Sequence, residues 1–174
     1  MKKDIQLSEK DILKPVISLA IPQLAGYWGY RLTAPSLSTW YASLEKPSFT
    51  PPDWVFEPVW IGLYLLMGIA LYLVWRQGVH RIDVKRALYI FFFQLAVSVF
   101  WVFVFFSRQS PFQALIVIAI LFLLIVLTML SFYPISRDAG LCLVPYMIWV
   151  GFALMLNLFI VLMNGSRAQL YMDV

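Results

Sequence analysis

WYASLEKPSFTPPDWVFEPVWIGLYLLMGIALYLVW, residues 40–75, joins a proline-rich aromatic loop directly to an uncharged apolar helix. Proline fixes φ and removes a backbone donor, so few backbone conformations are open to a loop that contains Pro47, Pro51, Pro52 and Pro58. The same stretch carries rings that can stack on a planar ligand, namely Trp40, Tyr41, Phe49, Trp54, Phe56 and Trp60. The pattern predicts a rigid lid above a membrane-spanning helix.

The composition excludes a soluble globular domain. The chain is 62% hydrophobic and 13% charged, whereas globular chains are roughly 45–50% apolar and about 25% charged. A lipid bilayer is therefore the expected partner. No nucleic-acid partner is expected, because the N-terminal lysines are interleaved with acids and form no basic cluster.

Charged residues divide the chain into five apolar segments, which predict an all-α bundle of five transmembrane helices. A spanning helix needs roughly 17–25 mostly apolar residues. The expected helices cover residues 12–33, 54–76, 87–107, 110–134 and 139–164, after an N-terminal extension of residues 1–11. The lid loop, residues 34–53, joins the first two helices within a single domain, residues 1–174. The first helix has the shortest uncharged run. We count it as spanning because, with an even number of spans, the positive charges would no longer be concentrated on one side of the membrane.

The positive charges fall unevenly on the two sides of such a bundle. The richer side carries Lys2, Lys3, Lys10, Lys14, Arg76, Arg81, Lys85, Arg86 and Arg137, and the other side carries Arg31, Lys46, Arg108 and Arg167. The positive-inside rule then places the N-terminus in the cytoplasm and the C-terminus and lid outside. A prokaryotic cytoplasmic membrane is the expected location.

Three of the expected helices present a face that combines a large aromatic residue with polar or small residues. These faces are Trp60, Tyr64, Met67, Gly68 and Leu71; Gln94, Ser98, Trp101 and Phe105; and Trp149, Ala153 and Asn157. Amides such as Gln94 and Asn157 should point into the bundle, because facing lipid is costly. They either hydrogen-bond between helices in a packed core or anchor a ligand in a pocket. Three converging faces under a rigid lid favour the pocket.

The motif W-Y-x-x-L-x-K-P-x-x-x-P-P-x-W-x-F-x-P-V-W-x-x-L-Y-x-x-M-G-x-A starts at Trp40. It resembles the hallmark of the TspO/MBR family, which comprises the tryptophan-rich sensory proteins and the mitochondrial translocator protein, or peripheral benzodiazepine receptor. QLAVSVFWVFVFF (94–106) and VPYMIWVGFALMLN (144–157) are similar to the family's third and fifth helices. Matches extend to Asn164.

The resemblance implies a five-helix bundle, usually a homodimer, that binds porphyrins and benzodiazepine-type ligands between its helices. The implied ligand-binding residues are Tyr41, Trp60, Tyr64, Gln94, Ser98, Trp101, Trp149, Ala153 and Asn157, under lid residues Trp40, Pro47, Pro51, Pro52 and Trp54. Some bacterial members are associated with light- and oxygen-dependent porphyrin breakdown, attributed to the tryptophans that match Trp60 and Trp149. Both are implied here as catalytic residues.

Some positions depart from the family or offer no chemistry. Ser98 replaces the family's asparagine and has a shorter reach, and Leu158 and Leu162 stand where the sterol motif of animal members needs Tyr and Arg.

His80, the single histidine, lies in a loop beside Arg81, so no metal site is expected. No hydrolytic arrangement is present in the sequence. No obligatory cofactor is expected, porphyrin being a ligand or substrate.

The leading interpretation is a membrane receptor or sensor of tetrapyrroles, protoporphyrin IX first and haem second. Its propionates would need cationic partners at the mouth, for which Arg31 and Lys46 are candidates. Glu57 is either a charge at a helix N-terminus or a gate of the entrance. A porphyrin transporter and a membrane scaffold remain as alternatives. Transporters usually show repeats or a charged midplane site, and the sequence has neither.

Overall fold

The computed structural model describes residues 9–170, and the regular elements in this range are all helices. They are α1 (Glu9–Ser36), the π-helix η1 (Leu37–Tyr41), α2 (Asp53–Trp75), α3 (Ile82–Val102), the π-helix η2 (Phe103–Ser107), α4 (Pro111–Phe132), α5 (Arg137–Cys142) and α6 (Val144–Leu170). Of the expected N-terminal extension, residues 1–11, only the last three lie within the described residues, and they belong to α1.

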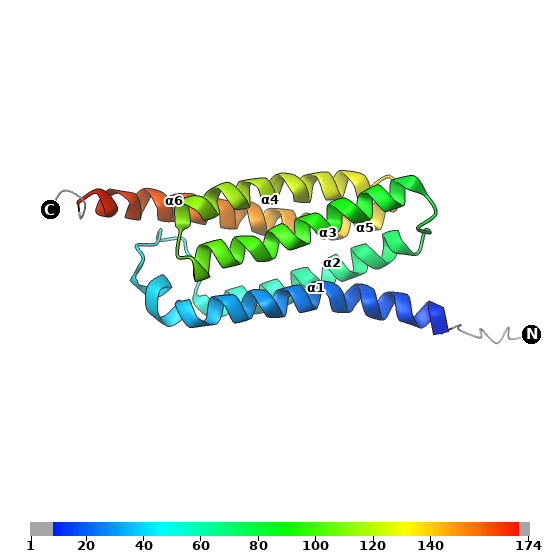
Figure 1. Cartoon of the computed structure of the whole chain (residues 1–174), viewed down its shortest axis with the longest axis horizontal. Coiled ribbons are helices and arrows are strands. Elements are labelled where there is room, and N and C mark those ends of the chain that lie inside the picture. Colours follow the sequence, from blue (N-terminus) through cyan, green and yellow to red (C-terminus); the bar gives the residue numbers. More distant parts are fainter. Residues whose placement is uncertain (1–8, 171–174) are drawn as a thin grey trace, which may run out of the picture.

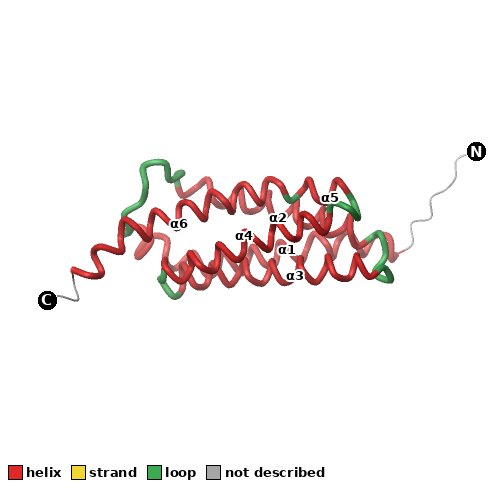
Figure 2. Tube along the Cα trace, turned by 90° about the horizontal axis from the view of Figure 1, so that it is seen from above, coloured by secondary structure: helices red, strands yellow, loops and turns green. Residues whose placement is uncertain are grey.

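The long helices form one bundle in which successive helices run in opposite directions (Figure 1). α1 packs against α2 and α3, α3 against α4, and α4 against α6, and contacts between α2 and α5 close the ring. The start of α1 and the end of α6 lie at opposite ends of the bundle (Figure 1). Loops are confined to these two ends apart from the short break before α6 (Figure 2).

Four segments of the described chain are long and apolar enough to cross a membrane: Asp53–Trp75, Ile82–Ser107, Pro111–Phe132 and Arg137–Gly165. They make the protein an integral membrane protein. α1, expected to be the first of five spans, is not among them, because its three prolines, Gln23 and several tyrosines lower its mean hydropathy. The expectation of five spanning helices is thus met for four.

Two of the expected boundaries differ from the structure. Helical turns continue from α1 through η1 to Tyr41, so the non-helical part of the lid is shorter than residues 34–53. Pro35 has no N–H for the α-helical ladder, and the wider π turns follow it. The fifth expected helix, residues 139–164, is broken at Leu143 into α5 and α6. Pro145 lies in the first turn of α6, where a missing N–H is tolerated.

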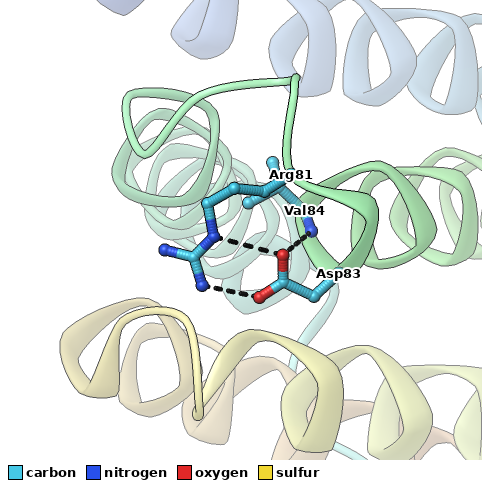
Figure 3. Close-up of polar contacts among 3 residues, drawn as sticks. All are labelled: Arg81, Asp83 and Val84. Carbon is cyan, nitrogen blue, oxygen red and sulfur yellow. Dashed lines mark hydrogen bonds and ion pairs between the residues drawn. The ribbon is translucent and has the colours of Figure 1, made fainter.

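The bundle is tightly packed at the end away from the lid. A Cβ on Gly68 would lie 2.8 Å from Leu19 Cα and 2.9 Å from the Ser18 carbonyl, so α1 and α2 touch through their backbones. At the same end the Arg81 guanidinium donates two hydrogen bonds to Asp83, whose carboxylate also accepts the Val84 N–H at the start of α3 (Figure 3).

Candidate ligand-binding site

A cavity of about 520 Å³ occupies the lid end of the bundle. α2 makes few contacts with α6, and residues of both helices line the space between them. The lining residues are Gln23, Gly26, Tyr27, Gly29, Tyr30, Thr33, Leu37, Tyr41, Asp53, Phe56, Glu57, Trp60, Ile61, Tyr64, Trp101, Val102, Phe105, Phe106, Trp149, Ala153, Leu156, Asn157 and Ile160. The volume lies within the roughly 300–1,000 Å³ of small-molecule sites.

Ten of the 23 residues that line the cavity are aromatic. Trp60 stacks on Tyr64 with ring centroids 5.7 Å apart and lies 6.5 Å from Trp101. On the α6 side, Trp149 packs against Phe56 at 5.8 Å. These indoles come from three different helices and present flat apolar surfaces to one space.

The polar groups of the wall are few, and most already have partners. Trp101 Nε1 donates to Asn157 Oδ1 at 3.4 Å, and Asn157 Nδ2 donates to the Pro111 carbonyl at 2.9 Å. Asn157 therefore fixes the Trp101 ring and joins α6 to the start of α4. Trp149 Nε1 is buried without a partner among the described residues. An unsatisfied buried donor costs about 1–3 kcal/mol.

Seven of the nine expected ligand-binding residues line the cavity, and Gln94 and Ser98 do not. Ser98 Oγ is 3.3 Å from the Tyr64 hydroxyl, behind the ring that faces the cavity. Gln94 lies one turn farther along α3, is 1% exposed, and has no partner for its amide among the described residues. The expected face of α3 was correct in direction, but only its end nearest the lid reaches the cavity.

The expected lid residues cover the site without lining it. Trp40 packs edge-on against Phe105 at 5.5 Å, and Pro47 is buried. Pro51 is half-buried and Pro52 is exposed. Trp54, the last of the expected lid residues, is 75% exposed, as an interfacial anchor would be.

One side chain fastens the loop to α6. Asn164 Nδ2 donates to the Glu45 carbonyl at 2.9 Å, and Asn164 Oδ1 accepts from the Glu45 N–H at 3.1 Å. Phe49 adds ring contacts with Phe152 and Phe159 of the same helix. The lid is therefore closed by both polar and aromatic contacts with α6.

Sequence reasoning missed the contribution of α1. Gln23, Gly26, Tyr27, Tyr30 and Thr33 line the cavity, at the i, i+3, i+4, i+7 and i+10 spacing of one helical face. That spacing could have revealed the face. A Cβ on Gly26 would lie 2.6 Å from the Tyr64 ring, so glycine here leaves room for the tyrosine that forms the cavity wall.

The charges at the mouth also differ from expectation. Arg31 donates to the Tyr27 hydroxyl at 3.3 Å, and Lys46 Nζ donates to the Tyr41 carbonyl and lies 4.2 Å from the centroid of its ring. Neither cation lines the cavity, whereas Asp53 and Glu57 do. Burial and the nearby negative charge of Asp53 raise the pKa of Tyr41 to about 12.

No three metal-ligating side chains cluster within residues 13–165, whose side chains the structure describes. His80 is exposed in the turn before α3, at the end away from the cavity. Cys142 is a half-buried free thiol in α5.

Comparison with known proteins agrees with this architecture. The model of the TspO/MBR family matches residues 18–163. The tryptophan-rich protein TspO of Archaeoglobus fulgidus is 42% identical over 155 residues, which cover 89% of this chain and 99% of that protein. Its Chlorobaculum tepidum counterpart is 40% identical over 89% of this chain and 98% of its own length. The human translocator protein is 34% identical over 78% and 81% of the two chains. The chain therefore belongs to the TspO/MBR family.

Proposed function

We propose that the protein is a membrane receptor that binds a tetrapyrrole, protoporphyrin IX in the first instance, in the cavity beneath the lid. The observation that carries the proposal is the convergence of Trp60, Trp101 and Trp149 on one space of about 520 Å³. Their rings suit a flat apolar macrocycle. One relative, from Cereibacter sphaeroides, is named a tryptophan-rich sensory protein, and others are named translocator proteins.

Equilibrium titration in the dark tests this proposal. Protoporphyrin is added to the detergent-solubilised protein while tryptophan fluorescence is recorded. Native protein should bind saturably, and the Trp60→Ala, Trp149→Ala double variant should bind at least about tenfold more weakly, because two walls of the site are removed. Equal weak binding by both proteins would instead favour the scaffold interpretation, in which these rings only pack.

We propose a second activity, light-dependent porphyrin breakdown, because Trp60 of α2 and Trp149 of α6 line the same cavity. Under illumination, molecular oxygen would oxidise the bound porphyrin, and the easily oxidised indoles would act on the excited state or its products. The test illuminates the same titrated sample. Trp60→Phe or Trp149→Phe should slow porphyrin loss while binding persists. Undiminished loss in both variants would remove the activity and leave the receptor intact.

A transporter is the competing function, and the closed lid is the observation that bears on it. Asn164 and Phe49 hold the loop over the cavity, so transport would need these contacts to break in each cycle. Sealed liposomes with porphyrin on one side distinguish the two functions. Net movement no faster than in empty vesicles supports the receptor, and faster movement supports transport.

We propose that α1 is a fifth span, with the N-terminus in the cytoplasm and the lid outside. α1 runs beside α2 along the bundle (Figure 1), and its outer side exposes Leu13, Val16, Leu24 and Trp28. The charge count behind this orientation includes Lys2 and Lys3, which lie outside the described residues. Cysteines introduced at Ser48 and Gln77 should react with impermeant reagents from opposite sides of the membrane. The homodimer stays a prediction, which cross-linking in membranes would test.

A further inference from the structure

Two carboxylates stand at the rim of the cavity. Asp53 and Glu57 begin α2 on the face that continues through Trp60 and Tyr64, and all four residues line the cavity. Their spacing of i, i+4, i+7 and i+11 keeps them on one side of the helix. The acids are therefore built into the ligand-facing surface, one to two turns above the Trp60 ring.

Neither acid forms an ion pair among residues 13–165, the part of the chain whose side chains the structure describes. The ion pair found in this range, between Arg81 and Asp83, lies at the far end of the bundle. Arg31 and Lys46 are engaged with Tyr27 and Tyr41 and lie outside the cavity lining. The other titratable groups that face the space are the phenols of Tyr27, Tyr30, Tyr41 and Tyr64. The raised pKa of Tyr41, caused by burial and then by Asp53, indicates that the field of Asp53 reaches the cavity wall.

We propose that Asp53 and Glu57 select ligands by charge, so that the site prefers tetrapyrroles with neutral or cationic edge groups over free dicarboxylates. This rests on the proposed tetrapyrrole function. A planar ligand in the cavity turns its polar edge towards the mouth, where its propionates would approach the two acids. At about 7 Å and an effective dielectric between those of a protein surface and water, each repulsive pair weakens binding about five- to tenfold.

The decisive probes are protoporphyrin IX and its dimethyl ester, which share the macrocycle and differ in charge. The quantity measured is the ratio of the two dissociation constants, diacid over ester. In the Asp53→Asn, Glu57→Gln variant this ratio should fall at least about tenfold relative to native protein. Asp138→Asn, an exposed acid of α5 at the other end of the bundle, is the control and should leave the ratio unchanged.

A salt series on native protein provides the same test without any substitution. Between about 0.02 and 0.5 M salt, screening should lower the diacid-to-ester ratio several-fold, because exposed charges interact less at a shorter Debye length. If cations instead attracted the propionates, added salt would weaken diacid binding and so raise the diacid-to-ester ratio. Arg31→Gln or Lys46→Gln would then also weaken diacid binding, and either result overturns the proposal.

The outcomes separate this inference from the function on which it rests. If both probes bind native protein and neither the acid substitutions nor salt changes the ratio, charge selection is wrong and the receptor stands. If neither probe binds native protein, the proposed function fails and the charge selection falls with it.

Discussion

The two ends of the bundle are built from the same apolar helices but are packed in opposite ways. At the α5 end, small residues bring backbones together: Gly68 touches the backbone of α1, and a Cβ on Gly140 would lie 2.9 Å from Tyr133 Cβ. At the lid end, Trp60, Trp101 and Trp149 line an open space. Close packing at one end and bulky rings at the other let a five-helix bundle hold a cavity without losing its core.

The largest effect is expected from breaking the close contact at the packed end. Gly68→Val would place side-chain atoms against Leu19 Cα and the Ser18 carbonyl, both of which belong to the backbone and cannot rotate away. Overpacking of this kind costs about 1–3 kcal/mol or more. Thermal unfolding in detergent, followed by circular dichroism, should show a clear loss of stability.

The matched control lies on the same helix. A Cβ on Gly62 meets nothing within 4 Å, so Gly62→Ala should keep or raise the stability, by up to about 1 kcal/mol from helix propensity. If both substitutions changed the melting temperature equally, the tight packing of α1 on α2 would not explain the stability of this end.

At the lid end, the next effect is local. Asn164→Ala removes two hydrogen bonds to the Glu45 backbone, each with a net contribution of about 0.5–1.5 kcal/mol. Hydrogen exchange in residues 44–52 should accelerate about tenfold or more, while exchange in α4 stays unchanged. Gln113→Ala, an exposed amide at the start of α4, is the control. Unchanged exchange in Asn164→Ala would show that the aromatic contacts of Phe49 alone keep the lid closed.

The smallest effect concerns pH. The pKa of Tyr41 is raised from 10.0 to about 12, so the unfolded chain loses this proton before the folded protein does. The contribution of the Tyr41 hydroxyl to the free energy of unfolding is fully present below pH 10 and is lost as the pH rises towards 12. Native protein should lose more stability than Tyr41→Phe across this window, as measured by unfolding at several pH values. Parallel curves for the two proteins would show that the Tyr41 hydroxyl is not protected in the lid.

The sequence was sufficient for the family, the helical bundle and most of the aromatic wall. Trp60, Tyr64 and Trp149 could be predicted to converge because their motifs are long and their helical periodicity is regular. The role of α1 was missed, although Gln23, Tyr27 and Tyr30 share one helical face that their spacing could have revealed; tertiary packing places that face on the cavity.

Other features depended on contacts distant in the chain. Gln94 and Ser98 share a helical face with Trp101. Only the position of the Tyr64 ring, whose hydroxyl contacts Ser98, shows that they lie behind the cavity wall. Arg31 and Lys46, the cations named as candidates for the mouth, do not line the cavity. They are adjacent to the site in sequence, but their side chains turn to Tyr27 and Tyr41, whereas Asp53 and Glu57 line the rim.

Filling the cavity tests the central claim most directly. Ala153 lines the cavity, so Ala153→Leu adds bulk to the site, whereas Met155→Leu changes an exposed position of the same helix. Dissociation constants for protoporphyrin IX in the dark should rise at least about tenfold in Ala153→Leu and stay at the native value in Met155→Leu. Native affinity in Ala153→Leu would contradict the account, because the porphyrin would then bind outside the cavity beneath the lid.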